Sequence, residues 1–363
     1  MADFRHLLAL SDNRGVFEHA ALAVPRPEHG YCADDVGRAL VVACREPTPN
    51  ADVVELAHTC IGYLTNGSRP DGRFRNRLSV LGEWGDDGAS DDASARAIWG
   101  IGTALARGVP EIRERALSLV DTAMVFRSPF PRATAVAVLG ASEVLSAIPD
   151  HAGASRLLED ALRSLPRPVD SSRWPWPEPR LTYANALLPD ALVVAGSRTG
   201  DGSAVVEGLE WLRWLVTLER HDDHFSFTPT GGWFTGEPRP AFDQQPIEAA
   251  TVSDACWRAW ELTGDVVWAQ DATLAIAWFH GTNDTGVSLA VTATGGGADG
   301  LTAAGRNENQ GAESTISLIL AAQLGELLAS GHAAHSTLSN SSSTAASETF
   351  AAPTARSAAP YVR

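Results

Sequence analysis

The sequence predicts an all-α protein built as an (α/α)6 toroid, two concentric rings of helices, with a small β-hairpin insertion. Two observations carry this prediction. Buried-type and half-buried-type helical segments alternate along the chain, as the inner and outer rings of a toroid require. In addition, six nearly all-apolar runs each follow a polar or proline-rich loop, and they start near Asp34, Asp91, Pro131, Tyr183, Gln245 and Asn309. A helical solenoid is the competing topology.

The predicted helices follow from the periodicity of apolar residues. Three inner runs are apolar on every side, as helices surrounded by protein should be: residues 36–44, 97–106 and 133–145. The predicted outer helices are amphipathic: residues 53–64, 111–124, 155–165, 205–218 and 266–279. Residues 4–10 are expected to complete the outer ring. Residues 225–234 alternate around Gly231 and Gly232, which predicts a short β-hairpin before the fifth inner helix.

A weak repeat supports the hairpin architecture. Ala33-Asp-Asp-Val-Gly-Arg-Ala-Leu and Ser90-Asp-Asp-Ala-Ser-Ala-Arg-Ala-Ile share a small-Asp-Asp pattern followed by Arg-Ala, and their first aspartates lie 57 residues apart (91 − 34). That spacing fits one helical hairpin with its loops. We therefore expect a toroid domain over residues 1–330. Residues 331–363 are rich in Ser, Thr and Ala and are expected to form a disordered tail.

The composition excludes several classes of function. All 28 basic residues are Arg, so chemistry that needs a lysine amine, a Walker-type phosphate loop or a protein-kinase site is excluded. The net charge of −16 argues against nucleic acid and anionic membranes as partners. Without a signal peptide or a run of 18 apolar residues, a cytoplasmic protein is expected. The four cysteines show no CxxC spacing, and Cys44 and Cys256 are expected to be reduced core thiols.

The toroid prediction also places the functional site. Inner helices of a toroid run in the same direction, so the loops that precede them gather at one end of the ring. Those loops cover residues 29–35, 83–92, 126–132, 174–185, 233–248 and 295–313. They contain many carboxylates, most of the side-chain amides and several aromatic rings. Rings stack on the apolar faces of sugars, and acids and amides bind hydroxyls, so this set suits a polyhydroxylated ligand.

The two aspartate pairs have both a structural and a functional interpretation. Asp34 and Asp35, like Asp91 and Asp92, stand where a helix begins, and Asp is a preferred N-cap. Each pair is followed by an arginine that should point inward, Arg38 or Arg96, and this recurrence favours a ligand-binding role over capping alone. A helix dipole lowers the pKa of a carboxyl group, so these aspartates suit a general base or a hydroxyl binder.

Three further loops contribute candidates. Pro246 and Glu248 are explained by a helix start, whereas Asp243, Gln244 and Gln245 are poor caps and suggest ligand binding. Glu178 is an isolated acid among Trp174, Trp176 and several prolines, surroundings that raise a carboxyl pKa as a general acid needs; a structural glutamate paired with Arg180 is the alternative. The glycine-rich segment before the last helix adds its own candidates: Asp299, Asn309, Gln310 and Glu313.

Other chemistries are less well supported. The glycine run contains no GxGxxG after a strand, so no dinucleotide or other cofactor is expected. His221-Asp-Asp-His224 has no obvious third ligand nearby, so a solvated loop is favoured over a metal site. There is no GxSxG motif and no cysteine with activating neighbours, which argues against acyl transfer.

Several strings resemble a bacterial group within the six-hairpin glycosidase superfamily, often labelled loosely as glycosidases or glycosyltransferases. They are Gly30-Tyr-Cys-Ala-Asp-Asp-Val-Gly-Arg-Ala, Asp71-Gly-Arg-Phe-Arg-Asn76, Ser90-Asp-Asp-Ala-Ser-Ala-Arg-Ala-Ile-Trp99, Phe242-Asp-Gln-Gln-Pro-Ile-Glu-Ala and Asn309-Gln-Gly-Ala-Glu-Ser-Thr. The resemblance spans residues 28–325. It implies the (α/α)6 fold and carbohydrate chemistry, without implying a particular sugar.

The leading hypothesis is a glycoside hydrolase that acts on an oligosaccharide or glycan with two carboxylates. Inversion is the expected stereochemical course, and retention stays open as the alternative. Glu178 or Asp243 is the expected acid, and Asp92 or Asp35 the expected base. The other residues expected to bind substrate are Tyr31, Asp34, Arg38, Asn76, Trp84, Asp91, Arg96, Trp174, Trp176, Tyr183, Asn185, Gln244, Gln245, Glu248, Asp299, Asn309, Gln310 and Glu313.

Two alternatives stay open. A sugar epimerase or polysaccharide lyase on the same fold needs a base such as His29, Tyr31 or Tyr183, and a pair of facing histidines in the pocket would favour it. A non-catalytic glycan-binding protein that assists a glycosyltransferase is the other alternative. The oligomeric state is not predicted.

Overall fold

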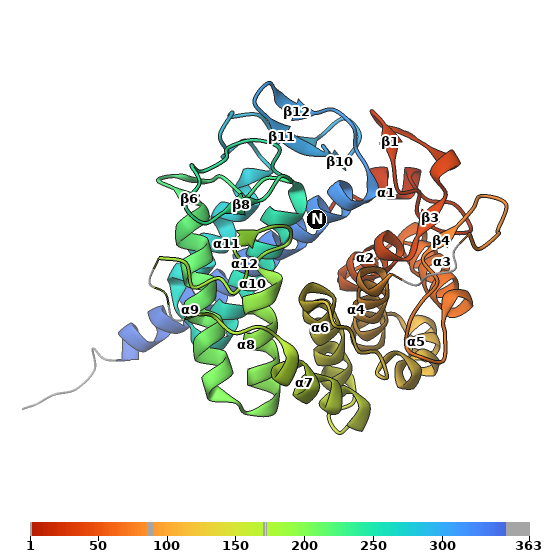
Figure 1. The fold of residues 1–363 in the computed structure, drawn as a ribbon, viewed down its shortest axis with the longest axis horizontal. Coiled ribbons are helices and arrows are strands. Elements are labelled where there is room, and N and C mark those ends of the chain that lie inside the picture. The colour runs from red at the N-terminus through yellow and green to blue at the C-terminus, as the bar shows by residue number, and fades with distance from the viewer. Residues whose placement is uncertain (1, 86–89, 170, 172, 346–363) are drawn as a thin grey trace, which may run out of the picture.

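The computed structural model describes residues 2–85, 90–169, 171 and 173–345, with residues 332–345 described by their backbone only. Figure 1 shows the chain passing around a ring, from the red N-terminal elements through the yellow α6 and α7 and the green α8 and α9 to the blue α12. Each inner helix packs against the next, and α12 packs against α2, which closes the ring. The predicted (α/α)6 toroid is confirmed.

The inner ring consists of the six even-numbered helices. Each begins close to the predicted start, because polar or proline-containing loops end there and the following run can only be buried. Their bounds are α2 (Ala33–Arg45), α4 (Asp91–Arg107), α6 (Pro131–Ala147), α8 (Leu187–Thr199), α10 (Pro246–Thr263) and α12 (Ala312–Ala345). Neighbouring inner helices come very close: a Cβ on Gly102 would lie 2.2 Å from the carbonyl oxygen of Gly140, so only glycine fits at this α4–α6 crossing.

The outer ring consists of amphipathic helices that begin with recognisable caps. The side chains of Asn50, Asp201 and Asp265 accept hydrogen bonds from the first turns of three of them, and Pro110 occupies the first turn of another. The outer helices are α3 (Ala51–Gly67), α5 (Pro110–Ala123), α7 (Ala152–Ser164), α9 (Gly202–Glu219) and α11 (Val266–Trp278). The short α1 (Arg5–Ala9) packs against α3 and α12, as expected for residues 4–10.

The strands are short and pair in twos in the described part of the chain. Most of those labelled in Figure 1 gather at one end of the helical ring. The antiparallel pairs are β1 (Ala20–Ala21) with β2 (Val24–Pro25), β3 (Tyr31–Cys32) with β4 (Arg77–Leu78), β5 (Arg180–Leu181) with β8 (Trp233–Phe234), β6 (Arg220–His221) with β7 (His224–Phe225), β9 (Ala290–Val291) with β10 (Gly296–Gly297), and β11 (Gly300–Thr302) with β12 (Gly305–Asn307). A 3-10 helix, η1 (Pro27–His29), precedes β3.

The predicted hairpin around Gly231 and Gly232 is wrong in its register. The short hairpin of this insertion is β6–β7, which turns at Asp222 and Asp223, whereas β8 pairs with β5 of the preceding loop. Burial explains the difference, because Phe225 and Phe227 stack on one another at 5.1 Å and are both fully buried. The first half of the segment is therefore buried in the core, and the second half, at Trp233 and Phe234, pairs with β5 instead.

The last inner helix, α12, runs past residue 331, where the composition predicts the start of a tail; residues 346–363 lie outside the described residues. Within the described residues, Ala312–Gly331 is long and apolar enough to cross a membrane, but this stretch packs in the ring against α2, α10 and α11. Its hydropathy is that of an inner helix. All four cysteines are free and buried, including Cys44 and Cys256 in inner helices.

Candidate active site

Two buried arginines occupy the N-terminal end of the inner ring, which we call the mouth. Arg38 on α2 and Arg96 on α4 are each 3% exposed. Arg38 forms ion pairs with Asp34, with Asp35 (Nη1–Oδ1, 3.3 Å) and with Glu313 of α12 (Nη1–Oε2, 2.7 Å). Arg96 reaches back to Asp34 (Nε–Oδ1, 2.6 Å) and donates to the Tyr183 hydroxyl. The two arginines thus tie together residues from four separate segments.

The same environment shifts two adjacent carboxyl groups in opposite directions. Burial acts to raise the pKa of Asp34, but the charges of Arg38 and Arg96 outweigh it and hold this pKa below its usual value. For Asp35, burial dominates over the attraction of Arg38, and the charges of Asp34 and Glu313 add to it, so its pKa rises to about 7. The expectation that the helix dipole would lower both values is therefore wrong for Asp35, because desolvation exceeds the dipole effect.

In the second aspartate pair, the Asp91 and Asp92 side chains point in different directions and have different contacts. Consecutive residues in a helix point about 100° apart, so Asp91 and Asp92 cannot face the same side. Asp91 accepts hydrogen bonds from Arg73 (3.0 Å) and Ser128 (2.7 Å), away from Arg96. Asp92 is exposed and forms no hydrogen bond with the described residues. The walls of the ring still remove part of its solvent, which raises its pKa despite the attraction of Arg96.

The 174–185 loop forms the next part of the mouth. Glu178 pairs with Arg132 of α6 (Oε2–Nη2, 3.1 Å), and the Trp176 indole donates to the same oxygen at 3.2 Å. The structural alternative named Arg180 as its partner; this is wrong, because Arg180 instead lies over the Phe234 ring, 4.9 Å from its centroid. The Glu178 side chain is 35% exposed, so one of its faces is open to a ligand.

Glu248 holds the end of this loop in place. Its two carboxylate oxygens accept hydrogen bonds from the backbone amides of Ala184 (2.5 Å) and Asn185 (3.3 Å), and it is 1% exposed. Ala184 has a positive φ of 46°, a conformation that needs such support. Burial and the charge of Glu219 raise the pKa of Glu248 to about 8 against these hydrogen bonds. We conclude that Glu248 positions Tyr183 and Asn185 rather than contacting a ligand.

Tyr183 and Asn185 face different partners. Burial is the largest cause that raises the pKa of Tyr183 to about 12, so its hydroxyl stays protonated near neutral pH. Asn185 is fully buried, and its oxygen accepts from Thr182 N (3.0 Å) and Arg132 (3.2 Å). Tyr183 can therefore bind a hydroxyl group at the mouth, whereas Asn185 braces the loop.

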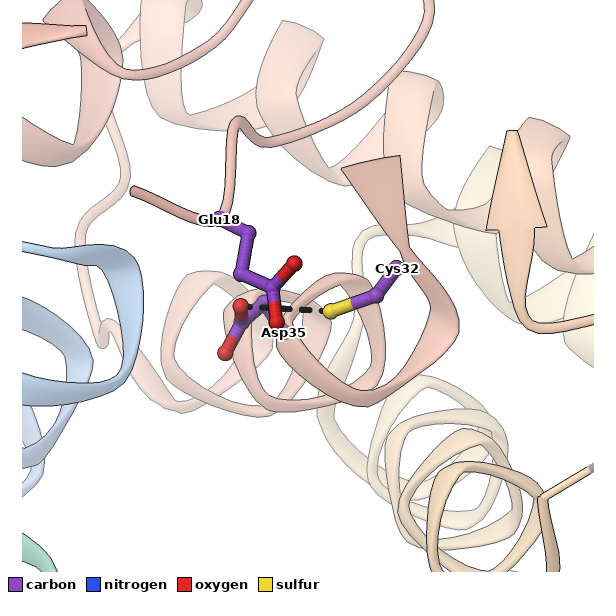
Figure 2. A group of neighbouring side chains, drawn as sticks. All are labelled: Glu18, Cys32 and Asp35. Atoms are coloured by element: carbon purple, nitrogen blue, oxygen red, sulfur yellow. Dashed lines mark hydrogen bonds between the residues drawn. The ribbon is translucent and has the colours of Figure 1, made fainter. Parts of the chain in front are cut away.

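Glu18, Cys32 and Asp35 meet beside the mouth (Figure 2). Their three possible ligand atoms lie within 4.8 Å of one another, and the Cys32 thiol donates to Asp35 at 3.2 Å. Both carboxylates already have cationic partners, because Glu18 pairs with Arg77 and Asp35 with Arg38. We assign no metal to this group.

Three residues that the sequence predicts as ligand-binding have structural roles in the fold. The Tyr31 hydroxyl donates to Asp12 at 2.6 Å, and its ring is fully buried. Trp84 packs edge-on against Tyr63 of the outer helix α3 at 5.1 Å. The Gln244 side chain is fully buried and accepts from both Phe227 N and the Trp278 indole at 3.0 Å. The sequence places these side chains at the mouth, but in the structure each contacts protein groups instead.

The remaining candidates shape the loops around the mouth. Asp299 accepts from Gly311 N (2.7 Å), Asn309 from Leu22 N (2.9 Å) and Gln310 from Thr294 (2.5 Å). The carbonyl of Asn76 accepts from Ala33 N at 2.9 Å, which joins the 71–76 loop to the start of α2. Trp174 lies edge-on to Trp214 and Trp233. Gln245 precedes α10 without a side-chain capping bond.

Asp243 is exposed, with a positive φ of 71°. Its carboxylate forms no hydrogen bond or ion pair with the described residues, and the structure thus does not link it to the buried arginines.

His221 and His224 stack at 5.5 Å, and His224 contacts Asp223 and Asp284. Residues 86–89 of the predicted second loop lie outside the described residues.

Sequence reasoning missed two side chains of this site. Arg132 holds Glu178, and its position at the second residue of an inner helix matches that of Asp92 in α4, a signal that could have found it. Glu18 comes from the N-terminal segment, and no local pattern marks it. Chain topology alone brings it to Asp35 and Cys32.

Comparisons with solved structures agree with this architecture. No protein-family model and no curated protein matches the sequence. A sugar epimerase from a ruminal bacterium superposes with a TM-score of 0.68 at 11% identity, covering 90% of this chain and 95% of that one. The cellobiose 2-epimerase from Bacillus thermoamylovorans B4167 gives 0.67 at 11% identity, with 89% and 95% covered. A metagenome-derived glycoside hydrolase family 9 endoglucanase gives 0.55 at 13% identity, with 85% and 70% covered.

The chain therefore has the six-hairpin (α/α)6 fold that these sugar epimerases and family 9 glycosidases share. The expected fold is confirmed at the level of architecture.

Proposed function

We propose that the chain is a carbohydrate-active enzyme that hydrolyses a glycosidic bond at the mouth. The observation that carries the proposal is the pair Asp34 and Asp92, on adjacent inner helices beside Arg96, whose pKa values are displaced in opposite directions. Two carboxyl groups whose environments separate their pKa values are the usual basis of acid and base assignments.

The roles follow from the direction of each shift. Asp92 keeps a proton to higher pH and has no protein partner among the described residues, so it would protonate the leaving oxygen. Asp34 is kept ionised by Arg38 and Arg96 and would act on water or on the anomeric carbon. This reverses the expected role of Asp92 and replaces Asp35, which is 4% exposed, by Asp34.

Other partly exposed groups of the mouth suit the binding of sugar hydroxyls. Glu178 can accept hydrogen bonds, and Tyr183 can donate one. Glu313, whose side chain is 32% exposed, pairs with Arg38 and can also accept a hydrogen bond. No step of this scheme needs a lysine or a cofactor, in keeping with the composition. A cytoplasmic location remains part of the proposal.

A second candidate function is epimerisation or isomerisation of a free sugar. The superposed epimerases match this chain over nearly their whole length, with 95% covered against 70% for the endoglucanase. His19 and His29 also meet edge-to-face at 4.9 Å, next to Glu18, and an exposed histidine can serve as the base that an epimerase needs.

One experiment separates the candidates. The chain is incubated with a panel of oligosaccharides and reducing sugars in D2O, and products are analysed by NMR and mass spectrometry. New reducing ends that disappear in Asp92→Asn support hydrolysis. Deuterium at a sugar carbon, lost in His19→Ala with His29→Ala, supports epimerisation. Binding of panel sugars without any turnover would contradict both and support the glycan-binding alternative.

A further inference from the structure

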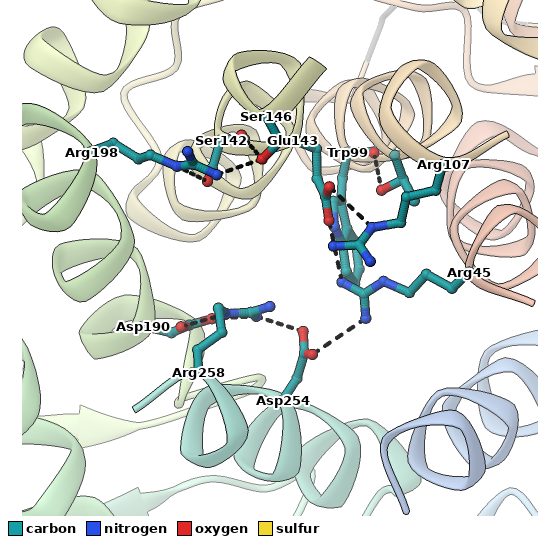
Figure 3. A network of polar contacts seen from close by, with 11 residues as sticks. Arg45, Trp99, Arg107, Ser142, Glu143, Ser146, Asp190, Arg198, Asp254 and Arg258 are labelled. Carbon is teal, nitrogen blue, oxygen red and sulfur yellow. Dashed lines mark hydrogen bonds and ion pairs between the residues drawn. The ribbon is translucent and has the colours of Figure 1, made fainter. Parts of the chain in front are cut away.

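The opposite end of the inner ring carries a second polar cluster, which we call the C-terminal network (Figure 3). Its charged members lie toward the C-terminal ends of the inner helices or on their inward faces: Arg45, Arg107, Glu143, Asp190, Arg198, Asp254 and Arg258. A helix C-terminus favours cations, so arginine is expected at these ends. Ion pairing within the protein explains most of this network. The polar groups that it leaves unpaired indicate a ligand site.

The acids of the network are used by buried ion pairs. Asp190, 2% exposed, binds Arg258 through both oxygens at 2.9 and 2.7 Å. The Asp254 carboxylate accepts hydrogen bonds from Arg258 at 2.5 Å and from Arg45 at 3.3 Å. Burial acts to lower the pKa of Arg258, but the charges of Asp190 and Asp254 outweigh it and raise this pKa. These contacts join α2, α8 and α10 and need no ligand.

Two donors are left over. Arg198 donates only to the hydroxyls of Ser142 (3.0 Å) and Ser146 (2.5 Å), and it pairs with no carboxylate in the described part of the chain. Trp99 is 5% exposed, and its indole N–H is buried without a partner among the described residues. An unpaired buried donor is destabilising, so a group that accepts a hydrogen bond from it would be stabilising.

Both leftover donors line a small cavity of about 140 Å³. Arg45, Arg107 and Arg258 also line it, but each already has a carboxylate partner. Arg258 pairs with Asp190 and Asp254, Arg45 pairs with Asp254, and Arg107 pairs with Glu143. The volume equals that of roughly four or five waters at about 30 Å³ each. Its size and the two leftover donors, Arg198 and the Trp99 indole, suit one small anionic group.

A larger cavity of about 580 Å³ shares Arg45, Arg107 and Trp257 with the small one. Gln323 of α12, 6% exposed, lines it with an Oε1 that has no partner among the described residues, while its Nε2 donates to Val42 O at 2.9 Å. Trp257 offers a half-buried ring. An aromatic face beside a free amide oxygen suits a hydroxyl-bearing organic body.

We propose that the C-terminal end of the ring is a second ligand site, which takes a hydroxylated small molecule bearing one phosphate or carboxylate group. The anionic group occupies the small cavity at Arg198 and Trp99, and the hydroxylated body lies in the larger cavity against Trp257 and Gln323. This inference does not rest on the activity proposed for the mouth, because it uses none of the mouth residues.

Isothermal titration calorimetry of the full chain tests the site with four probes: glucose 6-phosphate, glucuronate, glucose and inorganic phosphate. At least one of the two anionic sugars should bind at least tenfold more tightly than glucose and than inorganic phosphate. Phosphate and carboxylate sources are distinguished by which of these two sugars binds better. Binding equal to that of glucose overturns the anion pocket, and equality with inorganic phosphate overturns the role of the larger cavity.

Variants assign the binding to this end of the ring. Arg198→Gln should weaken the preferred probe at least tenfold, whereas Arg156→Gln, at an exposed arginine of α7, should leave it unchanged. Trp257→Ala should weaken it severalfold, and Trp257→Phe, which keeps an aromatic ring if the alanine variant unfolds, should restore most of it. Asp92→Asn should bind as the wild type does. Unchanged binding in Arg198→Gln, or loss of binding in Asp92→Asn, overturns the proposal.

Discussion

The two ends of the inner ring use the same kinds of side chain to opposite effect. At the mouth, Arg38 and Arg96 leave Asp92 without a partner among the described residues. At the C-terminal network, Arg258 closes on both Asp190 and Asp254. Without a protein partner, Asp92 is free to bind or react, whereas the buried pairs of Asp190 and Asp254 hold helices together.

Burial explains why the difference is possible in a single fold. Asp190 and Asp254 sit on the inward faces of helices, where an unpaired charge could not be tolerated. Asp92 stands at a helix start that opens to solvent, so it can remain unpaired at small cost. We therefore expect substitutions at the mouth to change activity and those at the C-terminal network to change stability.

The largest effect is expected at Asp92. Asp92→Asn removes the proposed acid and should lower kcat/KM on any hydrolysed glycan by about 10²–10⁴-fold, the usual contribution of general acid–base catalysis. Its melting temperature should stay close to that of the wild type, because Asp92 has no partner to lose in the described structure. Steady-state kinetics and thermal unfolding measure the two quantities.

Asp91→Asn is the matched control, one residue earlier on the same turn. It weakens contacts with Arg73 and Ser128 and should lower stability while sparing kcat. A kcat loss in Asp91→Asn as large as that in Asp92→Asn would contradict the division of roles between them.

The next largest effect is expected at Arg258. Arg258→Ala leaves Asp190 and Asp254 buried without their main partner and should cost about 3–5 kcal/mol in the free energy of unfolding. Urea denaturation followed by circular dichroism measures the loss. A change below about 1 kcal/mol would show that the pairs do not hold the ring together at this end.

Glu248 is expected to have an intermediate effect. Glu248→Ala removes the acceptor of two backbone amides, at Ala184 and Asn185, and should cost about 2–4 kcal/mol. Glu248→Gln keeps an acceptor oxygen and should cost less. If Glu248 contacted substrate instead of bracing the loop, the glutamine variant would raise KM with little loss of stability, as ligand titrations and urea denaturation would show.

The raised pKa values of Asp35 and Glu248 predict a pH dependence of stability. Each ionises near pH 4 in the unfolded chain but near 7 (Asp35) or 8 (Glu248) in the folded one. Unfolding therefore releases protons in this window, and stability falls as the pH rises through it, by at most about 1.4 kcal/mol per pH unit and group. The melting temperature should decline from pH 5 to 8, and less steeply in Glu248→Gln; an equal slope would be contrary to this prediction.

The smallest effect is expected at Arg198. Arg198→Gln removes an exposed arginine that pairs only with two serines, so the free energy of unfolding should change by no more than about 0.5 kcal/mol. The contrast with Arg258→Ala, in the same network, separates arginines that stabilise the ring from one that is free for a ligand. A loss similar to that of Arg258→Ala would assign Arg198 to the structural group.

The sequence predicts the architecture well because its signals are local. Caps and prolines mark helix starts, and the apolar period distinguishes inner from outer helices, so all six inner helices begin within a few residues of their predicted positions. Strand pairing is not local: Trp233 and Phe234 pair with Arg180 and Leu181, some fifty residues earlier, and no local pattern in the sequence predicts this.

By itself, the sequence determined the toroid, the end of the ring where polar loops gather, and the arginines that follow each aspartate pair. Only the tertiary structure decided which of two adjacent acids faces the mouth. It separated Asp92 from Asp91, turned Gln244 and Tyr31 inward, and brought Arg132 to Glu178. The physical reason is that neighbours distant in the chain compete for each side chain, and a buried donor or acceptor must take whichever partner the packing supplies.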